Sequence, residues 1–83
     1  MEQTLGYLRE ILSNYLDHQA QSRQIYEKLE STQYENEQAF VRALDEEETL
    51  YLNKILPDEI NHALEEQDYT RMSELNNVYE LLI

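Results

Sequence analysis

The chain has 83 residues, of which 18 are Asp or Glu and six are Lys or Arg, so its net charge is −12. A negative field of this size repels phosphate backbones and anionic membranes and attracts basic protein surfaces, so we expect no direct binding to nucleic acid or to a membrane. The apolar content of 41%, with seven Tyr, exceeds that of disordered acidic segments, and we expect residues 1–83 to fold as one helical domain.

The first predicted element is a long amphipathic helix between Thr4 and Glu30. Apolar side chains recur there at a seven-residue spacing, which predicts one face of a helix. These side chains are Leu5, Leu8, Leu12, Tyr15, Tyr26 and Leu29, with Ile11, Leu16 and Ile25 beside them. The polar residues Gln19 and Ser22 interrupt this seam, which leaves a solvated overhang, a bend and a register device at a dimer seam as alternatives.

A second helix is predicted to begin near Thr32. Thr32 and Glu35 have the spacing of a capping box, in which two side chains accept hydrogen bonds from free backbone N–H groups at a helix start. The apolar side chains that follow at helical spacing are Phe40, Val41, Leu44, Tyr51, Leu52 and Ile55. The acidic run 45–48 lies inside this helix, where its self-repulsion requires compensation. Pro57 is expected to end or kink the helix.

Two short helices are predicted for the rest of the chain. The first covers about residues 58–66 and presents Ile60, Ala63 and Leu64. Asp68 is the expected N-cap of the second helix. The apolar face of that helix comprises Tyr69, Met72, Leu75, Tyr79 and Leu82. Helices this short are unstable alone, so we expect them to pack as a hairpin.

The expected fold is therefore all-α: an antiparallel helical hairpin of two long helices, closed by a short C-terminal helical hairpin. Residues 1–44 form the hairpin core, and residues 45–83 form an acidic helical segment. A chain of this size buries only about 60% of its unfolded surface. We therefore expect it to gain stability as a homodimer.

The C-terminal segment resembles the IDEAL domain, a short helical module of Bacillus-type bacteria named after its most typical pentapeptide. The corresponding residues here are Ile60-Asn61-His62-Ala63-Leu64, of which three match. Asp68 after a short turn also fits the pattern, whereas Asn61 replaces an acidic residue and Met72 stands where an aromatic residue is more usual. The resemblance implies a small cytoplasmic accessory module without catalytic residues, and it names no partner.

Catalytic and metal-binding motifs are not evident. Glu59 and His62 have the i, i+3 spacing by which di-iron helices present two ligands, but such sites need a second pair and two further carboxylates. The other histidine, His18, is preceded by Tyr15 at that spacing. No phosphate-binding loop, catalytic triad or Cys nucleophile is present. We expect neither an enzyme nor a cofactor.

Partner-binding residues are instead predicted among the carboxylates and the tyrosines. The acidic candidates are Asp45, Glu46, Glu47, Glu48, Asp58, Glu59, Glu65 and Glu66. Residues 41–83 hold eleven acids and three bases, against seven acids and three bases in residues 1–40, so the second half is the expected electrostatic contact surface. Tyr7 and Tyr34 do not align with the apolar stripes, and tyrosine suits interface hot spots. We predict both as contact residues.

Charge and motifs together predict a small acidic regulatory protein that binds and modulates a basic partner in transcription, in replication or in the polymerase. In its extreme form it is a DNA mimic, whose carboxylates occupy phosphate-binding sites. The alternative is a structural or assembly module that pairs through the apolar helix seam, with charge serving solubility. The chain lacks Cys and has no basic and apolar leader at its N-terminus, so a cytoplasmic location is expected.

Overall fold

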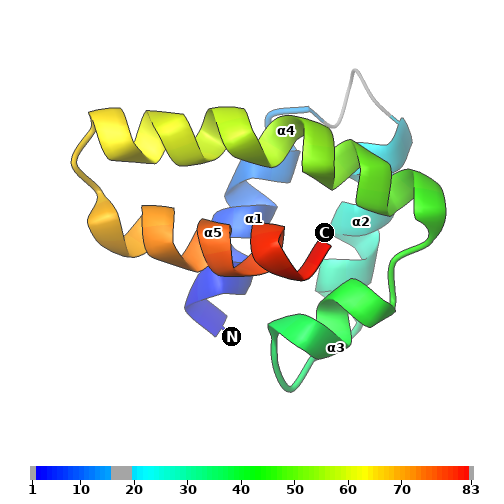
Figure 1. Ribbon diagram of the computed structural model, residues 1–83. Coiled ribbons are helices and arrows are strands. Elements are labelled where there is room, and N and C mark those ends of the chain that lie inside the picture. The colour runs from blue at the N-terminus through cyan, green and yellow to red at the C-terminus, as the bar shows by residue number, and fades with distance from the viewer. Residues whose placement is uncertain (1, 16–19, 83) are drawn as a thin grey trace.

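The computed structural model describes residues 2–15 and 20–82, and these residues form helices and connecting turns without a strand (Figure 1). The helices are α1 (Glu2–Ser13), α2 (Ala20–Ser31), α3 (Glu37–Arg42), α4 (Glu46–Glu65) and α5 (Tyr69–Leu82). The predicted all-α class is confirmed. The expectations for Leu16, His18 and Gln19 lie outside the described residues. The expected homodimer and the division of the chain at residue 44 stay predictions.

The helices pack in two layers around one apolar core. α4 and α5 run antiparallel side by side, α1 and α2 cross behind them, and α3 packs against α5 (Figure 1). The core is built from the apolar stripes of all five helices. Its buried members are Leu5, Leu8, Ile11, Leu12, Ile25, Leu29, Phe40, Leu52, Ile55, Leu56, Leu75, Val78 and Leu82. Burial of each large aliphatic side chain stabilises the fold by about 1.5–3 kcal/mol.

The first long helix expected from the sequence consists of two helices. α1 ends with a turn, in which the N–H groups of Asn14 and Tyr15 donate to the carbonyls of Ile11 and Leu12. The hydroxyl of Ser22 also donates to the carbonyl of Leu12, over 3.0 Å, and Ser22 is fully buried. Of the three explanations for the polar interruption at Ser22, the structure therefore supports a bend. It lets both helices turn their apolar faces to one core.

The second predicted helix also begins later than expected. The N–H of Thr32 donates to the carbonyl of Lys28 and so ends α2. Asn36 is the N-cap of α3, and its side-chain oxygen accepts from the N–H of Ala39 over 2.8 Å. Residues 32–35 are irregular, and Tyr34 within this segment packs edge to face against Phe40, with a centroid distance of 5.5 Å.

The acidic run stands at the start of α4 rather than inside a helix. Asp45 is the N-cap, and Asp45 and Glu48 form a capping box. Carboxylates at this position interact favourably with the positive end of the helix dipole. The self-repulsion inferred from the sequence is therefore offset by the helix end itself.

Of the two expectations for Pro57, an end or a kink, the end does not occur, and α4 continues through Pro57 to Glu65. A proline inside a helix costs about 3 kcal/mol. Ile55, Leu56 and Ala63, which lie on both sides of Pro57, are buried, and α4 packs along α5. This packing offsets the lost backbone hydrogen bond, so the predicted separate helix over residues 58–66 is the second half of α4.

The turn between α4 and α5 agrees with the sequence. Asp68 is the predicted N-cap, and its carboxylate accepts from the N–H of Arg71 over 3.2 Å. The N–H groups of Asp68 and Gln67 donate to the carbonyls of Ala63 and Leu64, the pattern of a Schellman motif. Gln67 has a φ of 60°, a conformation that glycine adopts at lower cost.

Candidate functional site

Exposed carboxylates gather at the two ends of α4. α4 has 20 residues and is about 30 Å long. Asp45, Glu46 and Glu47 are exposed at its start, and Glu65 and Glu66 are exposed at its end. Asp58 is exposed between the two groups. The predicted acidic residues thus form two clusters joined by one helix, rather than one continuous patch.

Glu48 differs from its neighbours because its side chain is only 1% exposed. One of its oxygens accepts from Lys28 Nζ over 2.5 Å and from the N–H of Asp45 over 2.8 Å. Lys28 Nζ also donates to the carbonyl of Ala43 over 2.8 Å. These bonds connect α2 to the start of α4. Glu48 therefore serves the fold, and its buried carboxylate does not belong to the exposed acidic surface.

Glu59 is half-buried and also makes an internal contact. The hydroxyl of Tyr15 donates to Glu59 Oε1 over 3.2 Å. Burial raises the pKa of Tyr15 above its ordinary value, and the nearby Glu59 carboxylate raises that pKa further. Glu59 therefore holds the end of α1 against the middle of α4.

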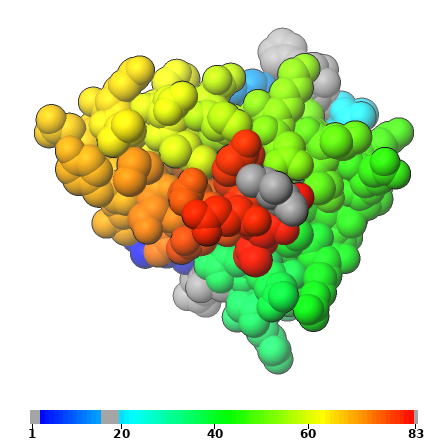
Figure 2. Space-filling view, in the orientation of Figure 1, coloured from blue at the N-terminus to red at the C-terminus, as the bar shows by residue number. Residues whose placement is uncertain are grey.

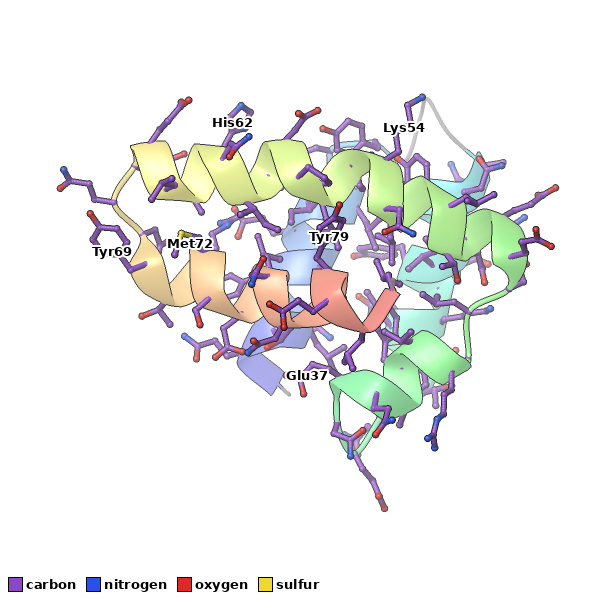
Figure 3. The ribbon with its side chains drawn as sticks, viewed as in Figure 1. Glu37, Lys54, His62, Tyr69, Met72 and Tyr79 are labelled. Carbon is purple, nitrogen blue, oxygen red and sulfur yellow. The ribbon has the colours of Figure 1, made fainter. Side chains whose placement is uncertain are left out.

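The pairing of Glu59 with His62 does not create a metal site. Figure 3 shows His62 pointing outward from α4, where its side chain is exposed, whereas Glu59 contacts Tyr15. The two side chains therefore diverge. No three His, Asp or Glu side chains gather within residues 2–15 and 20–82 in a way that could hold a metal ion.

The two tyrosines predicted as contact residues are half-buried. The hydroxyl of Tyr7 accepts from Gln3 over 3.0 Å, and the guanidinium of Arg71 lies 5.3 Å from the centre of the Tyr7 ring. Arg71 also pairs with Glu10 over 3.2 Å. Tyr34 packs against Phe40. Both rings therefore support the fold, and their predicted role in partner binding stays a prediction.

An open groove lies between α1 and the segment that follows α2. Its volume is about 560 Å³. The lining residues are Leu5, Arg9, Leu29, Glu30, Ser31, Thr32, Gln33 and Tyr34. Most of these side chains are polar, and the groove is open to solvent. It has neither the apolar lining nor the enclosure that small-molecule sites usually need.

Sequence reasoning missed several exposed apolar side chains. Leu50, Leu64, Tyr69 and Leu81 are 60%, 48%, 58% and 42% exposed. Leu64 and Tyr69 were expected on apolar faces that pack. Both lie next to the tight turn at Gln67, where a side chain leaves the end of the hairpin instead of entering it. The position of both residues beside a predicted turn was the sequence feature that could have indicated their exposure.

Sequence reasoning also missed a buried polar contact at Thr4. Thr4 is fully buried. Its hydroxyl lies 3.1 Å from Glu37 Oε2 and also contacts Glu74 Oε2. This single side chain therefore connects α1 to α3 and α5. No local pattern indicates it, because Glu37 and Glu74 are distant from Thr4 in the sequence.

The fold and its surface define a small, acidic, all-helical protein. None of the described helices is both long and apolar enough to cross a membrane. Residues 1–83 match the family described as CsgA, minor curli fiber component A, and the chain belongs to this family.

A relative among the curated proteins covers the whole chain. It is a protein of Bacillus subtilis (strain 168) described as a sigma-G-dependent sporulation-specific SASP protein, 49% identical over 83 residues, which is the full length of both chains. No solved structure matches the chain significantly. Neither description refers to an IDEAL domain, so that resemblance stays a prediction.

Proposed function

We propose that the protein is a small non-enzymatic regulator that binds a basic partner protein in the sporulating cell. The observation that supports this proposal most strongly is the pair of exposed carboxylate clusters on α4. Glu46, Glu47, Glu65 and Glu66 are all exposed, and none of them forms an ion pair within the described part of the chain. Their charge is therefore free to act on a partner.

The setting in sporulation comes from the relative, whose description names a sporulation-specific protein. The non-enzymatic role is supported by the sequence, which has no Cys, one Gly and no recognisable catalytic motif. The cytoplasmic location expected from the sequence would give the protein access to basic proteins that act on nucleic acid. A DNA mimic is the extreme form of this proposal.

The mechanism has two stages. The negative field first steers the basic partner and raises the encounter rate. Exposed apolar side chains are then buried in a small interface, which lowers the dissociation rate. Because exposed charges are screened by salt, binding should weaken steeply as the salt concentration rises.

The test compares two charge-reversed variants that carry equal net charge. In each, four exposed glutamates become lysine. The α4 variant changes Glu46, Glu47, Glu65 and Glu66, and the control variant changes Glu27, Glu30, Glu35 and Glu80. The wild-type chain and both variants are immobilised and exposed to an extract of sporulating cells at low salt.

We expect the wild-type chain and the control variant to retain the same basic protein and the α4 variant to lose it. Circular dichroism establishes that both variants remain helical. Retention of that protein by a folded α4 variant would contradict the proposal, because the carboxylates of α4 would then not contribute to binding.

An assembly module is the second candidate, and two observations favour it. The family description names a fiber component, and Leu50 and Leu81 expose large apolar side chains. The seam expected to pair with a partner helix is not available, because Leu5, Leu8 and Leu12 are buried in the core. A concentration series in analytical ultracentrifugation tests this candidate. The assembly candidate predicts an oligomer that forms as the concentration rises. Replacing Leu50 and Leu81 with serine should dissociate this oligomer.

A further inference from the structure

The turn between α4 and α5 exposes two large apolar side chains at one end of the molecule. Leu64 and Tyr69 are 48% and 58% exposed, and every residue from 64 to 70 is exposed. Figure 3 shows Tyr69 at the end of the helix pair, and in Figure 2 this turn, coloured yellow to orange, forms the left end of the visible face. We name residues 64–69 the hairpin tip.

The hairpin tip has a fixed backbone. The N–H of Asp68 donates to the carbonyl of Ala63 over 2.9 Å, and the N–H of Gln67 donates to the carbonyl of Leu64 over 3.0 Å. The bond between residues 63 and 68 closes the turn between Leu64 and Tyr69, so both exposed side chains belong to the same end of the hairpin. A surface that is ordered before binding loses little conformational entropy when a partner docks.

The charge of the hairpin tip has one sign. Glu65, Glu66 and Asp68 are exposed around the two apolar side chains, and residues 64–70 include no Lys or Arg. The nearest arginine, Arg71, is directed to Glu10 and Tyr7 on α1. The charge at the start of α4 is mixed, because Lys28 pairs with Glu48 there.

We propose that the hairpin tip is the docking site for a basic amphipathic helix of the partner protein. Leu64 and Tyr69 would be buried against its apolar face, and Glu65 and Glu66 would pair with its Lys and Arg side chains. An aromatic anchor with a charged rim is the usual anatomy of a protein interface. A second copy of this chain would bring like charge to the same place, which disfavours it.

This inference rests on the proposed function and is tested with defined probes. Two synthetic helical peptides carry the same number of lysines at the same positions. One has leucines and a tryptophan along the opposite face, and the other has serines there. Fluorescence anisotropy at low salt measures the affinity of each peptide for the full chain.

We expect the apolar peptide to bind about tenfold more tightly than the polar one, a difference of about 1.4 kcal/mol. The double change Leu64→Ser and Tyr69→Ser should abolish this difference and leave the affinity for the polar peptide unchanged. Because both side chains are exposed, the variant should fold, and circular dichroism verifies this. Retention of the tenfold preference by the folded variant would overturn the inference.

A second pair of variants separates the hairpin tip from overall charge. Glu65→Gln with Glu66→Gln should weaken binding of the apolar peptide about tenfold, since two charge contacts with the lysines of the peptide are lost. Glu46→Gln with Glu47→Gln removes the same charge at the other end of α4 and should weaken binding less than about twofold. Equal losses in the two variants would overturn the hairpin tip as the docking site and leave the proposed function intact. Failure of both peptides to bind would contradict the inference and the proposed function together.

Discussion

Lys28 Nζ lies 2.5 Å from Glu48 Oε1, and the Glu48 side chain is 1% exposed whereas that of Lys28 is 34% exposed. The same carboxylate oxygen accepts from the N–H of Asp45, which begins α4. One buried oxygen therefore fixes both the helix start and its contact with α2. A charge removed from water in this way needs its partner, because an unpaired buried carboxylate is strongly unfavourable.

Replacing Lys28 with methionine should lower the free energy of unfolding by about 3 kcal/mol, the low end of the range for breaking a buried pair, because Lys28 is partly exposed. Urea denaturation followed by circular dichroism measures the change. Lys54→Met is the matched control, because Lys54 is exposed, and its effect should stay within about 0.5 kcal/mol. Adding Glu48→Gln to Lys28→Met should restore part of the loss, since glutamine retains the capping box without the charge. Equal effects of the two single changes would show that the ion pair contributes nothing.

Replacing Gln67 with glycine should raise the free energy of unfolding by about 0.5–1 kcal/mol. Gln67 has a φ of 60°, and glycine reaches this region without the steric cost that a side chain incurs. Thermal denaturation should show a higher Tm. Glu66→Gly is the control, because Glu66 has a φ of −82°, and glycine there should destabilise the chain. A lower Tm for Gln67→Gly would mean that the Gln67 side chain supports the turn.

Replacing Thr4 with valine should lower the free energy of unfolding by about 1–2 kcal/mol, since the shape is retained and the buried hydroxyl is lost. Thr4 is the contact shared by Glu37 and Glu74, so their carboxylates lose a partner. Thr70→Val at an exposed position should change stability by less than about 0.5 kcal/mol. Chemical denaturation of both variants provides the comparison, and an unchanged Thr4→Val variant would refute the role of this contact.

Alkaline pH should destabilise the protein through Tyr15. Its pKa is raised in the folded state above the ordinary value of 10.0 by burial and by Glu59. The folded state therefore binds this proton more tightly than the unfolded state does. This contribution to stability is complete below pH 10 and is lost as the pH rises through the folded-state pKa.

The measurement is the free energy of unfolding as a function of pH above neutrality. Tyr15→Phe should reduce the loss of stability above pH 10, and Glu59→Gln should reduce it in part, because Glu59 is the second cause of the shift. A wild-type chain and a Tyr15→Phe variant with the same pH dependence would contradict this explanation.

Much of the fold was predictable from periodicity. Leu5, Leu8 and Leu12 repeat at helical spacing and are buried, and Asp68 is an N-cap as its position before an apolar helix indicated. The ends of the helices were harder to predict from the sequence. Asp45 and Glu48 have the same capping-box spacing as Thr32 and Glu35, and local sequence does not decide between the two boxes.

The remaining differences arise from tertiary packing. Continuation of α4 through Pro57 depends on its contact with α5, which local propensity does not include. Burial of Glu48 depends on Lys28, which is distant in the sequence and reaches it only after α2 folds back. For the candidate site, the acidic character of α4 was predictable from composition. Continuation of α4 through Pro57, which joins the two acidic clusters in one helix, was not predictable. The exposure of Leu64 and Tyr69 was indicated only by their position beside the predicted turn.

Electrostatic binding of a basic partner is the central claim, and a salt gradient tests it most directly. The wild-type chain is immobilised, loaded with an extract of sporulating cells at low salt and eluted with rising salt, and the eluted proteins are identified by mass spectrometry. We predict that a basic protein acting on nucleic acid is released below about 300 mM salt, where exposed charges are screened. Elution of only the chain itself, or retention of the partner beyond about 1 M salt, would contradict the account and favour an apolar assembly interface.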